Sequence, residues 1–311
     1  MRSNVTEYDL VAPSSLGSAL GMLASEPGRF TPLAGGTELM VALAAGRLPQ
    51  REMLSLHGVW ELRFIDFSAE TIALGAATTF SDIRRSAEIA RELPLLAQAA
   101  SWTGSVANQN RGTIGGNLVN ASPAADTPPA LLVYEARVTL VSAGPSGEMS
   151  RRTIPYGEFH LGYKKTALRA DELLYSVSVP RASGEYRGFI RKVGTRNAQA
   201  ISKVALAGLA RLSETAEGVT IRDVRLGAAS LRETPMRCAA TEDVLRGQVL
   251  SAAGLPALVE RARAALAGEA RPIDDIRSTA GYRAAVAGNL LEEFLRGLCP
   301  RDTPPPPILR S

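Results

Sequence analysis

Apolar residues recur along most of the chain at the spacings of helices or strands, and short polar or glycine-containing segments separate these runs. Leu16, Leu20 and Leu23 fall on one helical face after Ser15, a candidate cap, so a helix is predicted over about 15–26. The pattern further predicts a strand over 30–34, a helix over 38–45, a hairpin of strands over 62–66 and 71–76, and helices over 82–93 and 94–102. Short strands and helices are therefore expected to alternate in the first third of the chain.

The second half of the chain predicts longer elements. The strands expected there cover 137–143, 172–179, 186–193, 201–212 and 219–229, and two helices follow over about 255–267 and 275–297. The apolar residues of the last helix fall on one face, which indicates that it packs on a sheet or another helix. Strands followed by helices predict an α+β fold.

A change of pattern near residue 180 divides the chain into two predicted domains. The first covers 1–180, with possible subdomains 1–58 and 59–180. The second covers 181–299 and is expected to combine an antiparallel sheet with helices. Residues 300–311 contain four consecutive prolines and are expected to form an extended tail.

Charge and composition exclude several functions. The net charge is +4, but only four of the 35 basic residues are lysines, and aromatic residues make up 5%. Nucleic-acid binding favours a basic stripe interleaved with aromatics, so no nucleic-acid partner is expected. The apolar segment 41–45 is too short to span a bilayer and residues 1–8 are polar, so we expect a cytoplasmic protein without a membrane span.

The cysteines and histidines predict no metal site and no catalytic residue. Cys238 and Cys299 cannot alone supply an iron–sulfur or structural zinc site, which usually takes four ligands. His57 and His160 lie outside the glycine segments and are expected to be structural or exposed. No Ser–His–Asp arrangement emerges.

The most informative segment is Asn-Arg-Gly-Thr-Ile-Gly-Gly-Asn at 110–117, with Asp126 nine residues past its end. Adjacent glycines leave backbone N–H groups free to converge on an anion, and the absence of a lysine argues against a Walker-type loop. A second glycine pair lies about eighty residues earlier, within 33–39. Neither segment is a Rossmann fingerprint. The two together predict a cradle that grips a diphosphate from both sides.

Asp126 adds a second kind of contact. A carboxylate at this position is placed to accept hydrogen bonds from ribose or ribityl hydroxyls. The alternative is a cap of the helix that begins near Pro128 and Pro129, since Asp is a favoured cap residue. Both roles can hold at once.

Three motifs together carry a family resemblance: Ala-Gly-Gly-Thr-Glu-Leu at 34–39, the segment 110–117, and Ala-Ser-Pro-Ala-Ala-Asp-Thr-Pro at 121–128. Their order and spacing resemble the FAD-binding subunit of molybdenum hydroxylases, the family of the carbon monoxide dehydrogenase medium subunit and of the flavin part of xanthine dehydrogenase. The resemblance covers essentially the whole chain. It implies a two-part FAD-binding domain of the vanillyl-alcohol-oxidase/PCMH type, with FAD between this domain and the C-terminal one.

The resemblance also implies site residues. In the family, two segments hold the FAD diphosphate. The first matches Leu33, Ala34, Gly35, Gly36, Thr37 and Glu38 of this chain, and the second matches Thr113, Ile114, Gly115, Gly116 and Asn117. Asp126 matches a carboxylate that binds a cofactor hydroxyl, Leu174 an apolar flavin contact, and Lys192 a basic residue near the ring. A cation there would raise the flavin potential, and the alternative for Lys192 is a surface lysine at a strand end.

One segment departs from the family pattern. The family often has Gln-Val-Arg before Asn110, whereas this chain has Ala107-Asn108-Gln109. The contact just upstream of the second glycine segment is therefore open, with Thr103 and Gly104 as candidates by position. A four-iron insert of some relatives needs cysteines that this chain lacks.

The resemblance implies an electron-transfer subunit without a catalytic residue of its own. A large partner would carry the molybdenum cofactor, a small partner two [2Fe-2S] clusters, and the assembly would be a heterotrimer or its dimer. FAD on this chain would pass electrons to NAD+ or a quinone-like carrier. Two alternatives stay open: a self-contained FAD-dependent oxidoreductase on the same fold, and a structural subunit that has lost FAD.

Overall fold

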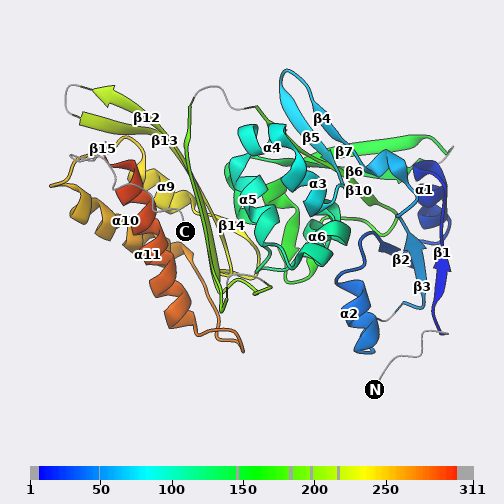
Figure 1. Ribbon diagram of the computed structural model, residues 1–311. Helices are drawn as coiled ribbons and strands as arrows, with labels where there is room; N and C mark the ends of the chain where they lie inside the picture. Colours follow the sequence, from blue (N-terminus) through cyan, green and yellow to red (C-terminus); the bar gives the residue numbers. More distant parts are fainter. Residues whose placement is uncertain are drawn as a thin grey trace.

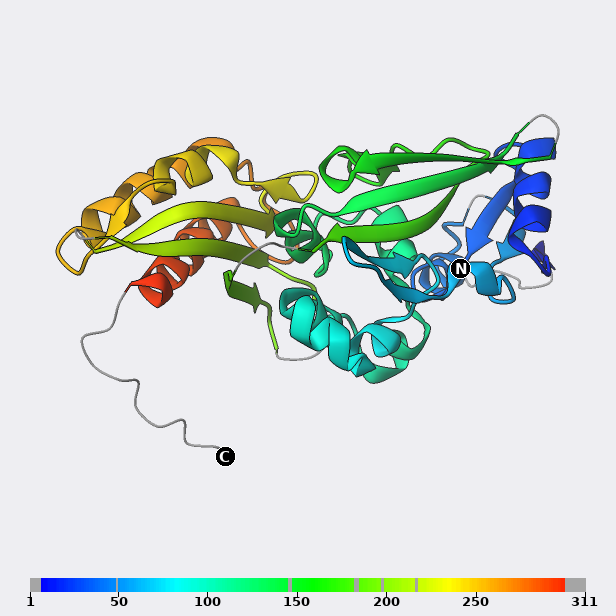
Figure 2. The ribbon, with the colours of Figure 1, turned by 90° about the horizontal axis from the view of Figure 1, so that it is seen from above.

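The computed structural model describes residues 7–48, 50–144, 147–181, 185–196, 199–215 and 218–299. The chain forms an elongated molecule with an N-terminal lobe, residues 7–181, and a C-terminal lobe, residues 185–299 (Figures 1 and 2). The tail expected over 300–311 lies outside the described residues. Within the described ranges, no helix is both long enough and apolar enough to cross a lipid bilayer.

A three-stranded parallel sheet forms the outer end of the N-terminal lobe, with β3 between β1 and β2. Its elements are β1 (Asp9–Val11), α1 (Leu16–Ser25), β2 (Phe30–Leu33), α2 (Leu39–Ala44) and β3 (Glu52–Ser55). The side chain of Ser15 caps α1 by accepting a hydrogen bond from the N–H of Ser18, as the sequence predicts. The leucines of α1 pack with Leu54 of β3. The sequence does not predict β3, because Glu-Met-Leu-Ser shows neither an alternation of apolar and polar residues nor a continuous apolar run.

A five-stranded antiparallel sheet forms the body of this lobe, in the order β4-β5-β10-β6-β7. The elements are β4 (Ile65–Phe67), β5 (Thr71–Gly75), β6 (Arg137–Ala143), β7 (Met149–Pro155) and β10 (Leu173–Pro180), with the small hairpin β8 (His160–Gly162) and β9 (Lys165–Thr166) and the 3₁₀ turns η2 (Trp60–Leu62) and η3 (Tyr156–Glu158). The predicted hairpin is β4–β5, although η2 occupies the start of its first expected strand. β7 is not predicted because it is an edge strand with mostly exposed residues.

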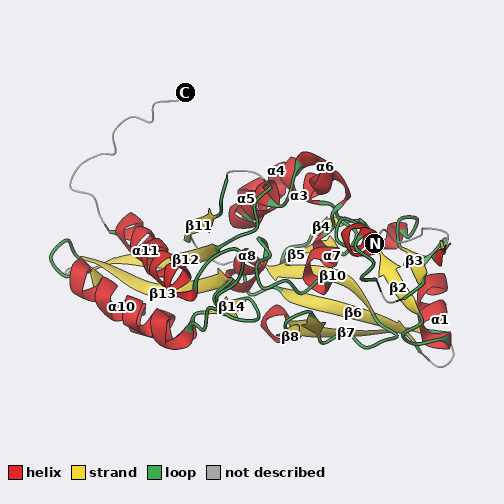
Figure 3. Ribbon diagram, turned by 90° about the horizontal axis from the view of Figure 1, so that it is seen from below, coloured by secondary structure: helices red, strands yellow, loops and turns green. Residues whose placement is uncertain are grey.

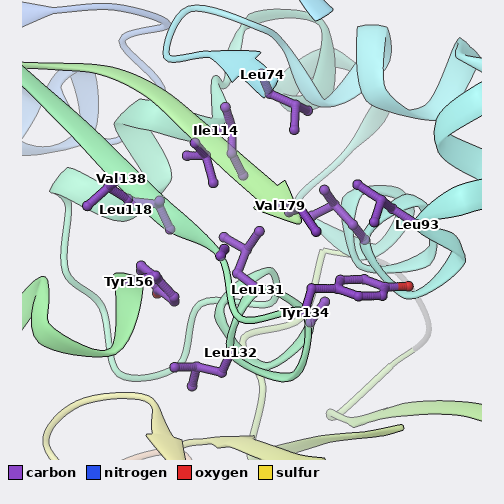
Figure 4. Close-up of a cluster of buried hydrophobic side chains, with 14 of the residues drawn as sticks. Leu74, Leu93, Ile114, Leu118, Leu131, Leu132, Tyr134, Val138, Tyr156 and Val179 are labelled. Carbon is purple, nitrogen blue, oxygen red and sulfur yellow. The ribbon is translucent and has the colours of Figure 1, made fainter. Parts of the chain in front are cut away.

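Short helices share a core with this sheet. They are α3 (Phe80–Arg85), α4 (Ala87–Glu92), α5 (Pro94–Trp102), α7 (Ile114–Val119) and α8 (Pro128–Val133). The helix α6 (Val106–Arg111) packs beside α3 and adds no residue to this core. The single helix expected over 82–93 is wrong, because Ser86 ends α3 and caps α4 by accepting from the N–H of Ile89. Figure 4 shows this core, where Ile114 of α7 and Leu131 of α8 lie among residues of the sheet.

The C-terminal lobe is an antiparallel sheet with helices packed against it (Figure 3). Its elements are β11 (Arg187–Val193), β12 (Val204–Thr215), β13 (Gly218–Ala229), β14 (Met236–Arg237), α9 (Ala239–Leu245), β15 (Val249–Leu250), α10 (Leu255–Glu269) and α11 (Ala280–Leu298). The predicted strands and helices are confirmed in order, although β12 begins at Val204 rather than at 201. Gly208 of β12 lets α11 approach closely, since a Cβ there would lie 2.9 Å from the ring of Phe294.

The helix α8 joins the two lobes. It follows the N-terminal motifs in the chain, yet all six of its residues are buried and it packs on β12 and β13. Gly227 of β13 permits this approach, because a Cβ there would lie 2.5 Å from the carbonyl oxygen of Pro129. Close packing without room for one methyl group is typical of a protein interior. The junction between the lobes is therefore built like a core.

An ion pair between the half-buried Arg152 and the buried Glu172 fixes the edge strand β7 to the segment before β10. Arg152 binds both carboxylate oxygens of Glu172, from Nε at 2.6 Å and from Nη2 at 2.7 Å, and the N–H of Arg169 donates to the same carboxylate at 2.8 Å. Glu172 is 6% exposed. Burial raises the pKa of Glu172, but the bonds from Arg152 and Arg169 outweigh it, and the pKa lies below its ordinary value.

We predict that Arg152→Met lowers the free energy of unfolding by about 3 kcal/mol at pH 7, because it leaves Glu172 buried without its cation. A carboxyl with a lowered folded pKa stabilises the fold above its unfolded pKa of about 4.3 and loses this contribution as the pH falls. The difference in melting temperature between variant and wild type should accordingly shrink from pH 7 to pH 4. Arg151→Met, at the exposed neighbouring position, is the control. A difference that stays constant with pH would contradict this account.

Candidate functional site

The two glycine segments meet in space. Gly35 lies directly against the backbone of the second segment, since a Cβ at Gly35 would fall 2.0 Å from the carbonyl oxygen of Arg111 and 2.9 Å from the Cα of Gly112. No other residue type fits there without moving one backbone away from the other. The two segments, which the sequence expects to hold one ligand from both sides, are thus neighbours in the fold.

The first segment presents free backbone donors. Residues 35–38 connect β2 to α2, and Gly36 has a φ of +76°, in the left-handed region that favours glycine. Within the described part of the chain, the N–H groups of Gly35, Gly36, Thr37 and Glu38 donate to no protein acceptor. Consecutive N–H groups in such a turn form a concave site for an anion. This segment agrees with the predicted cradle.

The second segment differs from the prediction. Gly115 and Gly116 lie in the first turn of α7, and their N–H groups are already bonded, to the carbonyl oxygen of Ala76 at 2.9 Å and to Oγ1 of Thr113 at 3.0 Å. The N–H of Ile114 donates to the carbonyl oxygen of Thr78 at 3.0 Å. The expectation that these glycines offer free N–H groups is therefore wrong. Gly115 serves close packing instead, because a Cβ there would lie 2.6 Å from Ala76.

A pocket opens where the two segments meet. The motif residues that line it are Ala34, Gly35, Asn110, Arg111 and Thr113, and residues that sequence reasoning did not assign to the site, among them His57, Trp60, Arg63 and Thr79, complete the wall. Arg63 is paired with Asp82. The guanidinium of Arg111 has no hydrogen bond or ion pair to any described residue. The pocket therefore holds one uncommitted cation beside the free N–H groups of the first segment.

Asp126 and Lys192, expected as separate cofactor contacts, pair with each other across the two lobes. Nζ of Lys192 lies 2.6 Å from Oδ2 of Asp126 and donates to the carbonyl oxygen of Trp102 at 3.1 Å. Ser202, which the sequence did not single out, donates from Oγ to Oδ1 of Asp126 at 2.6 Å. Asp126 is 8% exposed. Burial raises the pKa of Asp126, and the charge of Lys192 opposes this rise.

The structure decides between the alternative roles that the sequence left open for Lys192 and for Asp126. Lys192 is not a surface lysine, since 9% of its side chain is exposed. Asp126 does not cap α8, because the residue at the cap position is Thr127 and no side chain caps this helix. Thr127 instead donates from Oγ1 to Oδ1 of Asn117 at 2.6 Å, which ties the loop of Asp126 to α7.

The remaining candidates occupy different environments. Leu174 is 5% exposed, pairs with Leu140 of β6, and lies in the core of the N-terminal lobe. Gly104 has a φ of +64° and lies two residues after Trp102. The carbonyl oxygen of Trp102 accepts a hydrogen bond from Lys192. His160 is held by the carbonyl oxygen of Leu118 at 2.7 Å, and burial lowers its pKa, which agrees with a structural role. Among the described residues, no cluster of His, Cys, Asp and Glu can hold a metal ion.

Comparison with known families decides the class of this site. The family described as "FAD binding domain in molybdopterin dehydrogenase" matches residues 6–182, and the family described as "CO dehydrogenase flavoprotein C-terminal domain" matches residues 189–298. The chain belongs to this family of FAD-binding subunits. The resemblance carried by the three motifs is thus confirmed over nearly the whole length of the chain.

Individual relatives agree with the family assignment. The carbon monoxide dehydrogenase medium chain of Hydrogenophaga pseudoflava is 30% identical over 93% of this chain and 96% of its own length. The xanthine dehydrogenase FAD-binding subunit of Escherichia coli O157:H7 is 30% identical over 79% of this chain and 82% of its own length. A crystal structure of the Hydrogenophaga pseudoflava enzyme contains a chain that superimposes with a TM-score of 0.84 at 28% identity, covering 92% of this chain and 95% of that one.

The residues present fit the cofactor of the family. A diphosphate needs several N–H donors and a cation, and the first segment with Arg111 supplies both from groups without a described protein partner. A sugar hydroxyl needs an acceptor, and the carboxylate of Asp126 retains acceptor capacity beyond its two bonds. The chemistry of the donor set therefore matches FAD.

We predict that Gly35→Ala destabilises the protein by about 2 kcal/mol, because the added methyl group overlaps the Arg111 carbonyl and forces the two segments apart. Gly21→Ala is the matched control, since nothing lies within 4 Å of a Cβ at this position in α1. That exchange should raise stability by about 0.5–1 kcal/mol. Thermal unfolding of both variants measures the difference, and equal melting temperatures would refute the contact.

Proposed function

We propose that this chain is the FAD-carrying electron-transfer subunit of a molybdenum hydroxylase complex. In this proposal electrons arrive from [2Fe-2S] clusters on a small partner, after hydroxylation of an organic substrate at a molybdenum cofactor on a large partner, and leave to NAD+ or another acceptor. The assembly is a heterotrimer or its dimer. The observation that carries the proposal is the row of free N–H groups at 35–38, in contact with a second family motif and beside Arg111.

Each candidate residue receives one role in this proposal. The N–H groups of residues 35–38 hold the diphosphate of FAD, with Leu33 and Ala34 at the start of their turn. Asp126 accepts a hydrogen bond from a cofactor hydroxyl, and Lys192 places its charge near the flavin ring. Thr113–Asn117 support the first segment through α7, and Gly104 and Leu174 shape the surroundings of the ring.

FAD supplies two-electron redox chemistry when it is bound, and the residues of this chain supply its position and its electrostatic environment. Among the described residues, the one charged side chain that contacts Asp126 is that of Lys192, and both side chains are engaged. A base poised to take a proton from an organic substrate needs a free acceptor within reach of that substrate. This favours a subunit that passes electrons over a self-contained oxidoreductase.

We predict that Asp126→Asn weakens FAD binding about tenfold or more. The amide keeps the size of the side chain but loses the charge that strengthens a hydrogen bond from a hydroxyl group. Titration of the purified chain with FAD, followed by flavin fluorescence, measures the dissociation constant. Asp66→Asn, at an exposed position of β4, should leave it unchanged. Equal affinities of Asp126→Asn and wild type would remove Asp126 from the site.

We further predict that the FAD-loaded chain alone oxidises no member of a panel of aldehydes and nitrogen heterocycles, as measured by bleaching of the flavin under anaerobic conditions. Co-expression with the proposed large and small subunits from the native source should yield a complex that contains molybdenum and iron and whose flavin is bleached by one substrate class. Substrate-dependent bleaching of the isolated chain would instead establish a self-contained oxidoreductase. A chain that stays colourless with FAD would establish a purely structural subunit.

A further inference from the structure

Ser202 lies just before β12, and its hydroxyl group contacts the carboxylate that we assign to the cofactor sugar. The residue is 0% exposed, and its Oγ lies 2.6 Å from Oδ1 of Asp126. This bond runs from the C-terminal lobe to the loop between α7 and α8 of the N-terminal lobe. A short hydrogen bond to a buried carboxylate is stronger than one between neutral groups.

The two oxygens of Asp126 have different partners. Oδ2 accepts from Lys192 and Oδ1 accepts from Ser202. Lys192 is also the cation assigned to the flavin ring, so its ammonium group would serve both Oδ2 and the ring. Ser202 is the one side chain, among the described residues, whose hydrogen bond goes to Asp126 alone. The carboxylate needs such a donor, because burial disfavours its charge.

The C-terminal lobe fixes Ser202 independently of Asp126. The carbonyl oxygen of Ser202 accepts from Oγ of Ser230 at 3.1 Å. Arg283, which is 2% exposed, donates from Nη1 to the carbonyl oxygen of Lys203 at 2.9 Å and from Nη2 to Oδ1 of Asp275 at 2.7 Å. Bonds to the carbonyl groups of Ser202 and of the next residue thus hold this backbone in place before any ligand binds, which is what a preorganised donor requires.

We propose that Ser202 is a positioning residue for FAD: it holds the Asp126 carboxylate in the orientation that accepts a cofactor hydroxyl, and so makes FAD affinity depend on the packing of the C-terminal lobe. The proposal rests on the assignment of Asp126 to the cofactor in the proposed function. It concerns a residue outside the three motifs, on the lobe opposite to the N–H groups of residues 35–38.

The test compares side chains of matched shape. Ser202→Thr keeps the hydroxyl group and adds a methyl group. Ser202→Val has the shape of threonine without the hydroxyl group. Ser202→Ala removes the hydroxyl group without adding volume. FAD titrations of the full chain should show about tenfold weaker binding for the Val and Ala variants and a dissociation constant within about threefold of wild type for the Thr variant. If the added methyl group prevents folding of both larger variants, the role of Ser202 is tested by the Ala variant and by a double-mutant cycle with Asp126→Ala.

A double-mutant cycle shows whether Ser202 acts through Asp126. Ser202→Ala should cost no further affinity in an Asp126→Ala background, because the partner of the hydroxyl group is gone. Ser230→Ala is the control for a merely structural role, since Ser230 bonds the same backbone segment but not Asp126. It should weaken FAD binding less than Ser202→Ala does, because the hydroxyl group of Ser202 stays next to Asp126.

Three results would overturn the proposal: wild-type affinity of Ser202→Ala, an equal loss in Ser230→Ala, or a loss from Ser202→Ala that persists in full without Asp126. These results leave the proposed function intact as long as the wild-type chain binds FAD. A wild-type chain that binds no FAD would instead refute the proposed function, and with it the role of Ser202.

Discussion

The structure depends on one buried carboxylate, Asp126, that the two lobes share. Taking a charged group out of water costs several kcal/mol unless partners replace the lost hydration. Both partners of Asp126, Lys192 and Ser202, come from the opposite lobe. The N-terminal lobe therefore carries a charge that only the packed C-terminal lobe can stabilise. This links the geometry of the candidate site to the packing of α8 at the junction.

The two glycine segments illustrate how similar motifs serve different physical needs. Gly35 and Gly115 both sit where a Cβ would overlap a neighbouring backbone, so both are required for close approach of two elements. The N–H groups of residues 35–38 also donate to no acceptor among the described residues. The N–H groups of Gly115 and Gly116 are instead bonded to Ala76 and Thr113. A pair of glycines alone thus does not distinguish a ligand cradle from a tight contact.

Much of the fold follows from the sequence where elements are long or periodic. α11 shows its apolar face, and Ser15 and Pro94 mark helix starts, because local chemistry decides these features. The strand β3 shows neither an alternating pattern nor an apolar run, and β7 is an exposed edge, so tertiary pairing alone defines them. The break of the expected helix at Ser86 depends on a side-chain cap that competes with a continuous helix.

The site likewise contains residues that the sequence locates and residues that only the fold brings to it. Family motifs locate Asp126 and Lys192, but nothing in their spacing indicates that they pair, because this contact spans 66 positions and two lobes. Ser202, Trp60 and Arg63 carry no motif and reach the site only through the fold. A serine in a polar segment before a strand gives no sequence signal of its role.

The helix α8 has one more consequence. A helix with no side facing water has no stable place in either lobe alone, because each lobe by itself would expose its apolar residues. The two matched families therefore meet at a boundary in the sequence, but the two lobes are expected to unfold together as one cooperative unit. Division of the chain at that point would leave α8 in the N-terminal fragment without β12 and β13, the strands on which it packs, and would expose its apolar residues to water.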